Sequence, residues 1–128
     1  MNTTTISIIV TSLIITGALW LGLSNGTSEV ASTQNVSVVS GQQVVAINAK
    51  GGYMPKLTAA KANMPTTLRI TTNSTFDCSA SVSIQSLGIR KFLPQSGTTD
   101  LEVPAQKAGS TLQGVCAMGM YHFDVRFE

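Results

Sequence analysis

At 128 residues the chain has room for about one domain. Its formal net charge of +2 is too small to indicate nucleic-acid binding, and no basic cluster interleaved with aromatic residues is present. The sequence contains no nucleotide-binding loop, no Ser-His-Asp set and no motif of paired carboxylates, so we expect a protein that is not an enzyme.

The N-terminal region is apolar. Residues 6–23 read "ISIIVTSLIITGALWLGL" and carry no charge, and about 20 such residues cross a bilayer. A cleaved signal peptide would have a basic start and a shorter apolar region, whereas the first basic residue here is Lys50. We therefore predict a retained transmembrane helix within residues 1–24, although cleavage after "EVAS" stays open. A short head before the span predicts a single-pass cell-membrane protein whose soluble domain is extracytoplasmic.

Residues 25–41 follow as a polar linker, beginning with the small and polar stretch "NGTSEVASTQ". The rest of the chain has no helical period and consists of short β-rich segments separated by turns. An additional strand at 35–40 is an open alternative. The clearest expected strands span residues 42–49, 66–73, 78–84, 110–116 and 122–128.

The spacing of these segments predicts the fold class. "GGYMP" (51–55) is expected to form a corner, the apolar stretch 86–97 a loop over one end of a barrel, and "TTDLEVPAQKAG" a strand and turn. In the last strand Phe123, Val125 and Phe127 alternate with polar residues, as in a half-buried strand. Seven or eight short strands indicate an all-β Greek-key β-sandwich or barrel, with residues 42–128 as its domain.

The loop before the last strand is rich in sulfur. Residues 116–121 read "CAMGMY", and Gly119 would let the loop turn tightly between Met118 and Met120. Two thioethers and the thiolate of Cys116 could then face one point. Such soft ligands select Cu(I), whereas zinc prefers Cys and His. Methionines in a core strand are the alternative, but a loop with a central glycine should not bury two methionines for packing alone.

The two cysteines allow a second interpretation. Two cysteines in an extracytoplasmic domain ordinarily form a disulfide. If Cys78 lies beside Cys116, the same proximity supports either a disulfide or a metal site of two thiolates. The neighbouring methionines favour the metal site, because a structural disulfide has no need of them.

The order of these motifs resembles the cupredoxins, the small copper-binding β-sandwiches, over about residues 42–128. The matching elements are "GYMP" (52–55), Cys78, "GIRKFLP" (88–94) and the segment 108–128. Within that group the chain is most similar to membrane-anchored cupredoxin-fold Cu(I) chaperones of Gram-positive bacteria and to related domains of copper-exporting P-type ATPases. In these proteins a cysteine replaces the middle-strand histidine and C-x-M-x-M fills the ligand loop.

The resemblance implies a function and a set of ligands. Cys78 with Cys116 and Met118 with Met120 would hold one or two Cu(I) ions, the thiolates forming the tighter site. Whether Met54, Asp77 or His122 adds a ligand is left open. The implied function is a membrane-anchored copper chaperone or buffer that passes Cu(I) to a copper-exporting P-type ATPase, for copper homeostasis and resistance.

Two other functions remain as alternatives. The first is an electron-transfer cupredoxin, but a blue-copper site needs two histidines and the chain has one, His122. The second is a non-metal β-sandwich that a Cys78–Cys116 disulfide stabilises and that serves in protein interaction.

Overall fold

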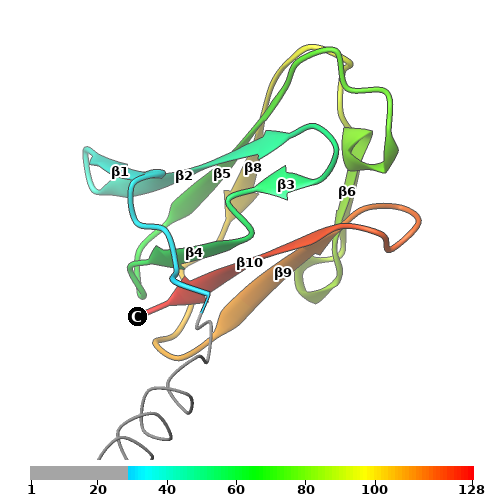
Figure 1. Ribbon diagram of the computed structural model, residues 1–128. Coiled ribbons are helices and arrows are strands. Elements are labelled where there is room, and N and C mark those ends of the chain that lie inside the picture. Colours follow the sequence, from blue (N-terminus) through cyan, green and yellow to red (C-terminus); the bar gives the residue numbers. More distant parts are fainter. Residues whose placement is uncertain (1–28) are drawn as a thin grey trace, which may run out of the picture.

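The computed structural model describes residues 29–128, which form a two-layered β-sandwich (Figure 1). The expected membrane anchor, residues 1–24, lies outside the described residues. Within 29–128, no helix has the length and apolar character needed to span a membrane. The prediction of an all-β sandwich is confirmed, and the helical structure of the described part is limited to two short 3-10 turns, η1 (Cys78–Ala80) and η2 (Gln85–Leu87).

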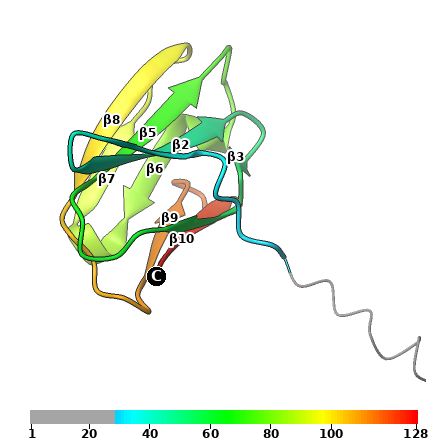
Figure 2. The same cartoon turned by 90° about the vertical axis from the view of Figure 1, so that its left-hand side faces the viewer.

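The first sheet has the strand order β1-β2-β5-β8, and the short β3 pairs with the end of β2, on the same edge of β2 as β1. Strand β2 runs parallel to β5 and antiparallel to β1, while β8 runs antiparallel to β5. Figure 2 shows β2, β5 and β8 as one layer, apart from β9 and β10. The strands are β1 (Val36–Val39), β2 (Gln42–Ala49), β3 (Tyr53–Met54), β5 (Thr66–Thr72) and β8 (Gly97–Val103).

The second sheet has the order β4-β10-β9-β6-β7. Strand β10 lies between β4, to which it is parallel, and β9, to which it is antiparallel. Strand β6 pairs with β7 over four residues but meets β9 only at Ser83 and Val115. The strands are β4 (Leu57–Ala60), β6 (Ser81–Ile84), β7 (Ile89–Phe92), β9 (Thr111–Val115) and β10 (His122–Phe127).

The core lies between the sheets and follows from the alternation in the strands. Phe123, Val125 and Phe127 of β10 are all buried, as the sequence predicts. The ring of Phe123 packs edge-on against Tyr53, with the ring centroids 5.0 Å apart. Gly114 pairs with Phe123 across β9 and β10, and a Cβ atom on Gly114 would overlap the Phe123 ring. The core therefore depends on glycine at this position.

Three parts of the chain differ from the expectation. Strand β1 lies within residues 25–41, so the alternative of a strand at 35–40 is confirmed and the sheet includes part of the stretch expected to be a linker. Cys78 belongs to η1 and not to the following strand, because the Asp77 side chain caps this turn by accepting a hydrogen bond from the Ser79 N–H. Residues 89–92 form the edge strand β7 where a loop was expected, because their backbone pairs with β6.

Candidate functional site

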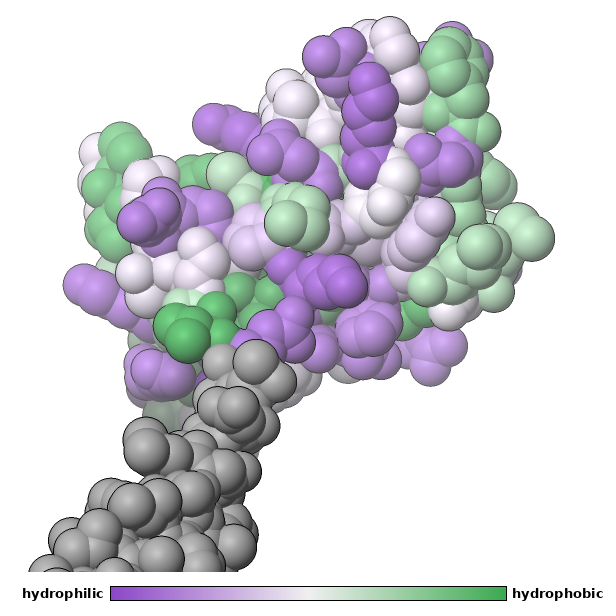
Figure 3. All heavy atoms as spheres, in the orientation of Figure 1, coloured by the Kyte–Doolittle hydropathy of each residue, from purple (hydrophilic) through white to green (hydrophobic). Residues whose placement is uncertain are grey.

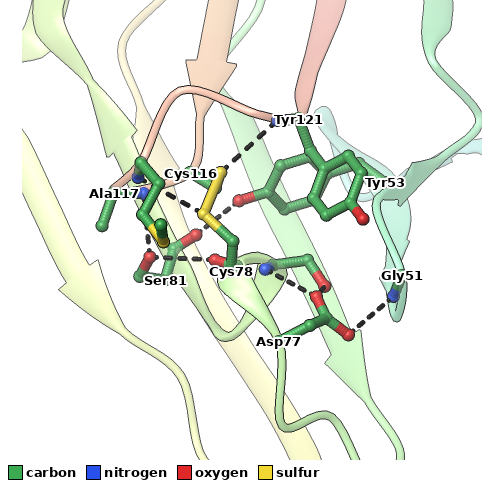
Figure 4. The surroundings of a disulfide bond; sticks show 10 residues. Gly51, Tyr53, Asp77, Cys78, Ser81, Cys116, Ala117 and Tyr121 are labelled. Atoms are coloured by element: carbon green, nitrogen blue, oxygen red, sulfur yellow. Dashed lines mark hydrogen bonds between the residues drawn. A yellow bond between two sulfur atoms is a disulfide. The ribbon is translucent and has the colours of Figure 1, made fainter.

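Cys78 and Cys116 are joined by a disulfide at one end of the sandwich (Figure 4). Cys78 opens η1, and Cys116 directly follows β9. The two Cα atoms are 5.6 Å apart. Cys116 is buried and Cys78 is half-buried, and the bond uses both cysteines of the chain. Of the two arrangements that the sequence left open for neighbouring cysteines, the structure contains the disulfide.

The loop after Cys116 is a tight turn held by its own backbone. The Gly119 N–H donates to the Cys116 carbonyl at 2.9 Å, and the Cys116 N–H donates to the Tyr121 carbonyl at 3.0 Å. Gly119 has a φ of +71°, in the left-handed region that other residues rarely adopt. The predicted role of Gly119 in turning the loop is confirmed. This turn fixes the directions in which Met118 and Met120 leave the backbone.

Each sulfur atom of the disulfide accepts a hydrogen bond from a backbone amide of this loop. The Met118 N–H donates to the Cys78 Sγ at 3.3 Å, and the Tyr121 N–H donates to the Cys116 Sγ at 3.4 Å. Amide donors of this kind stabilise the negative charge of a thiolate more strongly than they stabilise a neutral sulfur. The loop thus supplies one donor to each sulfur at the place where two thiolates would form on reduction.

Ser81 connects the two segments that carry the cysteines. Its hydroxyl donates to the Cys78 carbonyl at 3.0 Å and accepts a hydrogen bond from the Ala117 N–H at 3.0 Å. Its carbonyl accepts a hydrogen bond from the buried Tyr53 hydroxyl, and Figure 4 shows Ser81 and Tyr53 beside the disulfide. Sequence reasoning missed both residues, because each acts through bonds to backbone groups that only the folded chain brings together.

The electrostatics near the disulfide are set by Asp77 and Tyr53. The Asp77 carboxylate accepts hydrogen bonds from the Ser79 hydroxyl, the Ser79 N–H and the Gly51 N–H, and these bonds lower its pKa. Burial, and then the nearby Asp77 charge, raise the pKa of Tyr53 to about 12. Asp77 therefore remains ionised at neutral pH and serves as a cap that joins η1 to the β2–β3 turn.

The methionines of the loop are exposed, as a loop with a central glycine predicts. Met118 is 76% exposed and Met120 is 63% exposed. In Figure 3 apolar side chains gather at the end of the sandwich where this loop projects. Met118 lines a hollow of about 450 Å³ together with Cys116, Arg90 and Phe92.

Met120 lies in a different place from Met118. It lines a second hollow, of about 170 Å³, together with Met54 and His122. Met118 thus lies at the hollow that Cys116 lines, and Met120 lies at the other one. The sequence suggested that the two thioethers could face one point, and in the structure they do not. Within residues 29–128 no three His, Cys, Asp or Glu side chains cluster in a way that could hold a metal ion.

The donor set at the disulfide suits a soft metal after reduction. A disulfide offers no thiolate, so in this form Cys78 and Cys116 are poor ligands. Two added electrons and two protons convert the bond into two thiols whose Cα atoms start 5.6 Å apart. The two thiolates, with the thioether of Met118 on the hollow that Cys116 also lines, would form a donor set that favours Cu(I) over hard cations.

The solved structures that resemble this fold include two copper-binding ones. One is the metal-binding domain of the Cu(I)-exporting P-type ATPase CopA of Streptococcus pneumoniae D39 with Cu(I), with a TM-score of 0.68 and 17% identity over 77% of this chain and 98% of that chain. The other is a copper binding protein in the apo form, solved by NMR, with a TM-score of 0.68 and 22% identity over 77% of this chain and 100% of that one. At these identities the likeness shows a shared fold.

The family comparison is more specific. No curated protein matches the chain. Residues 13–124, which are most of the sequence, match the family described as the cupredoxin-like domain. The match includes both sheets and both cysteines. The chain therefore belongs to the cupredoxin-like domain family.

Proposed function

We propose that the protein is a Cu(I) chaperone or buffer that holds copper between Cys78 and Cys116 when their disulfide is reduced. The observation that carries this proposal is the position of the cysteine pair. The two cysteines lie within bonding distance, each sulfur faces a backbone N–H, and the loop beside them presents exposed methionines. A disulfide that served only to stabilise the fold would not need those methionines.

The redox step requires an external dithiol. The dithiol transfers two electrons and two protons, so that its own two thiols become a disulfide while the Cys78–Cys116 bond breaks into two thiols. Binding of Cu(I) then displaces the thiol protons, and the ion is held by the two sulfurs. Met118 borders the same hollow as Cys116 and can add a thioether. A thioether is a neutral ligand that detaches singly, which suits release of the ion by ligand exchange.

The recipient in this proposal is a copper-exporting P-type ATPase, and the site of action is the outer side of the cell membrane. The uncharged stretch of residues 6–23 supports an anchor. The shared fold with the metal-binding domain of such an ATPase supports the partner. In this role the protein binds and transfers copper for copper homeostasis, and it catalyses no reaction.

A Cu(I) titration of the reduced full chain in detergent, against a competing chelator, tests this proposal. We expect Cys116→Ser and Cys78→Ser to abolish tight binding, because a single thiolate cannot replace the pair. The double variant Met118→Leu/Met120→Leu should keep the tight site and lose only weaker binding. Equal stoichiometry and affinity in all of these variants would refute the assignment of the ligands.

The disulfide itself favours one other function, a non-metal sandwich for protein interaction. In that case the bond would be permanent and indifferent to copper. Thiol titration and mass measurement of the folded chain, with and without a mild dithiol, distinguish the two functions. The chaperone proposal expects two titratable thiols after mild reduction and their protection by Cu(I). A disulfide that stays intact under those conditions would support the interaction domain.

A further inference from the structure

The second hollow gathers the soft ligands that the cysteine site does not use. It lies between β3 and the start of β10, and its potential metal ligands are Met54, Met120 and His122. Met54 is 60% exposed and Met120 is 63% exposed, so two thioethers border the same small hollow in contact with solvent. His122, the single histidine of the chain, lies beside them. Single exposed apolar residues are ordinary, but two exposed thioethers and an imidazole around one hollow are not explained by packing.

The backbone holds these three residues in place. Met54 lies in β3, whose register pairs it with Asn48 of β2. Met120 follows Gly119 in the tight turn, and His122 is the first residue of β10, opposite Val115. Between them Tyr121 packs on Gly52, with its Cδ1 atom 3.5 Å from the position of a Gly52 Cβ. The turn and the β2–β3 corner are therefore in contact, which fixes the two walls of the hollow relative to each other.

We propose that Met54, Met120 and His122 form a Cu(I) site of their own, which is separate from the cysteines and can be filled while the disulfide is intact. Two thioethers and one neutral imidazole form a donor set that suits Cu(I). Met118 lines the other hollow and takes no part. The inference rests on the proposed function for the identity of the metal, but the site contains no thiolate and its occupation needs no reductant.

Lys56 is expected to lower the metal affinity of this site. Its side chain also lines the hollow, and neither Asp nor Glu does. An ammonium group repels a bound cation. The carboxylates of Glu29 and Asp124 share an adjoining hollow with Lys56 and His122 but do not line this one. The site is therefore weaker than a pair of thiolates, and Lys56→Gln should tighten metal binding without adding a ligand. A weaker site that remains open to solvent would receive copper first, before the cysteines are reduced.

The test uses the oxidised full chain in detergent, with the disulfide verified by mass, and Ag(I) as a probe that resembles Cu(I) but does not change oxidation state. Carbon-13 labels on the methionine methyl groups let each thioether be followed by NMR. We expect one equivalent of Ag(I) to shift the methyl signals of Met54 and Met120. The signals of Met118 and of Met64, which lies between β4 and β5, should stay in place.

Variants supply the controls. Met54→Leu, Met120→Leu and His122→Asn should each weaken Ag(I) binding by about tenfold or more, since each removes one ligand of three. Met118→Leu and Met64→Leu are matched substitutions and should leave the affinity unchanged. Absence of Ag(I) binding by the oxidised chain, or an equal loss with Met118→Leu, would overturn the inference. Because the cysteines cannot bind in the oxidised chain, this result is independent of the titration that tests the cysteine site.

Discussion

Ser81 and Tyr53 support the cysteine pair without being candidate ligands. Ser81 bonds to the backbone on both sides, at Cys78 and at Ala117, and the Tyr53 hydroxyl donates to the Ser81 carbonyl from the core. A buried tyrosine hydroxyl without a partner would be costly, so this bond also explains why a polar group is tolerated there. At the residue scale, the geometry of the sulfur atoms depends on this set of hydrogen bonds.

Replacing Tyr53 tests that dependence. We expect Tyr53→Phe to lower the free energy of unfolding by about 1–2 kcal/mol at neutral pH, because the Ser81 carbonyl loses its donor. The folded pKa of Tyr53, about 12, lies above its ordinary value of 10.0. Stability from this group is therefore fully present below about pH 10 and is lost as the pH rises toward 12.

The measurement is denaturant unfolding of the oxidised full chain and of the variant at rising pH. The difference in the free energy of unfolding between wild type and Tyr53→Phe should stay constant up to about pH 10 and narrow from about pH 10 to about pH 12. Tyr121→Phe is the matched control, since Tyr121 lies at the surface of the same site. A gap that stays constant with pH would contradict the assigned role of the Tyr53 hydroxyl.

At the residue level the sequence predicted the exposed turn better than the residues that support it. The spacing of Cys116, Met118 and Met120 around Gly119 is a local pattern, so the exposed turn could be inferred from it. The separation of Met118 from Met120 into two hollows could not, because it depends on β3 and on β7, which come from distant parts of the chain. Ser81 and Tyr53 carry no local signal of their roles.

The strands of the second sheet that carry the cysteine site differ in how extensively they pair. Strands β9 and β10 pair over five residues, whereas β6 meets β9 only at Ser83 and Val115. Strand β9 is therefore paired along its length with β10 but at only one position with β6. The hollow that Met118 lines lies on the β6 side. The disulfide and the Ser81 hydrogen bonds join β6 to β9 where backbone pairing does not. Side chains, and not backbone pairing, therefore link the two cysteine segments at this end of the molecule.

The packing between β9 and β10 requires glycine at position 114 of β9. The Phe123 ring lies over it, so Gly114→Ala would force the ring or the strands apart. We expect the free energy of unfolding to fall by about 1–3 kcal/mol, as in overpacked cores, and thermal unfolding of the full chain measures it. The double variant Gly114→Ala/Phe123→Leu should recover part of the loss, because leucine leaves room for the methyl group. An alanine variant as stable as wild type would contradict this packing.

The elements predicted best from sequence are those with one buried face. The bounds of β2, Gln42–Ala49, and of β10 follow from alternating apolar residues that are indeed buried. Strand β7 was missed because it is an edge strand with three exposed residues in sequence, and Phe92 is 79% exposed. The 3-10 turn at Cys78 was missed because its small residues also suit a strand, and the Asp77 cap decides between them.

On the scale of the whole molecule, the disulfide joins segments 38 residues apart in the sequence. Closing a loop of this length restricts the unfolded chain and contributes about 3–4 kcal/mol to stability. Reduction should lower the midpoint of urea unfolding correspondingly, and Cu(I) should restore most of the loss by linking the same two sulfurs. Cys78→Ser/Cys116→Ser is the control that dithiol should not affect and that Cu(I) should stabilise only slightly, through the weaker site of Met54, Met120 and His122. A reduced chain that Cu(I) fails to stabilise would contradict a cysteine site for copper.

The central claim is that one pair of cysteines exists either as a disulfide or as a tight Cu(I) site. The most direct measurement is Cu(I) affinity of the full chain in detergent, determined against a strong chelator in the reduced form and in the oxidised form. We predict one tightly bound Cu(I) in the reduced form and loss of that tight site on oxidation, leaving only weaker binding. Equal, tight binding in both forms would show that copper is held elsewhere and would contradict the account.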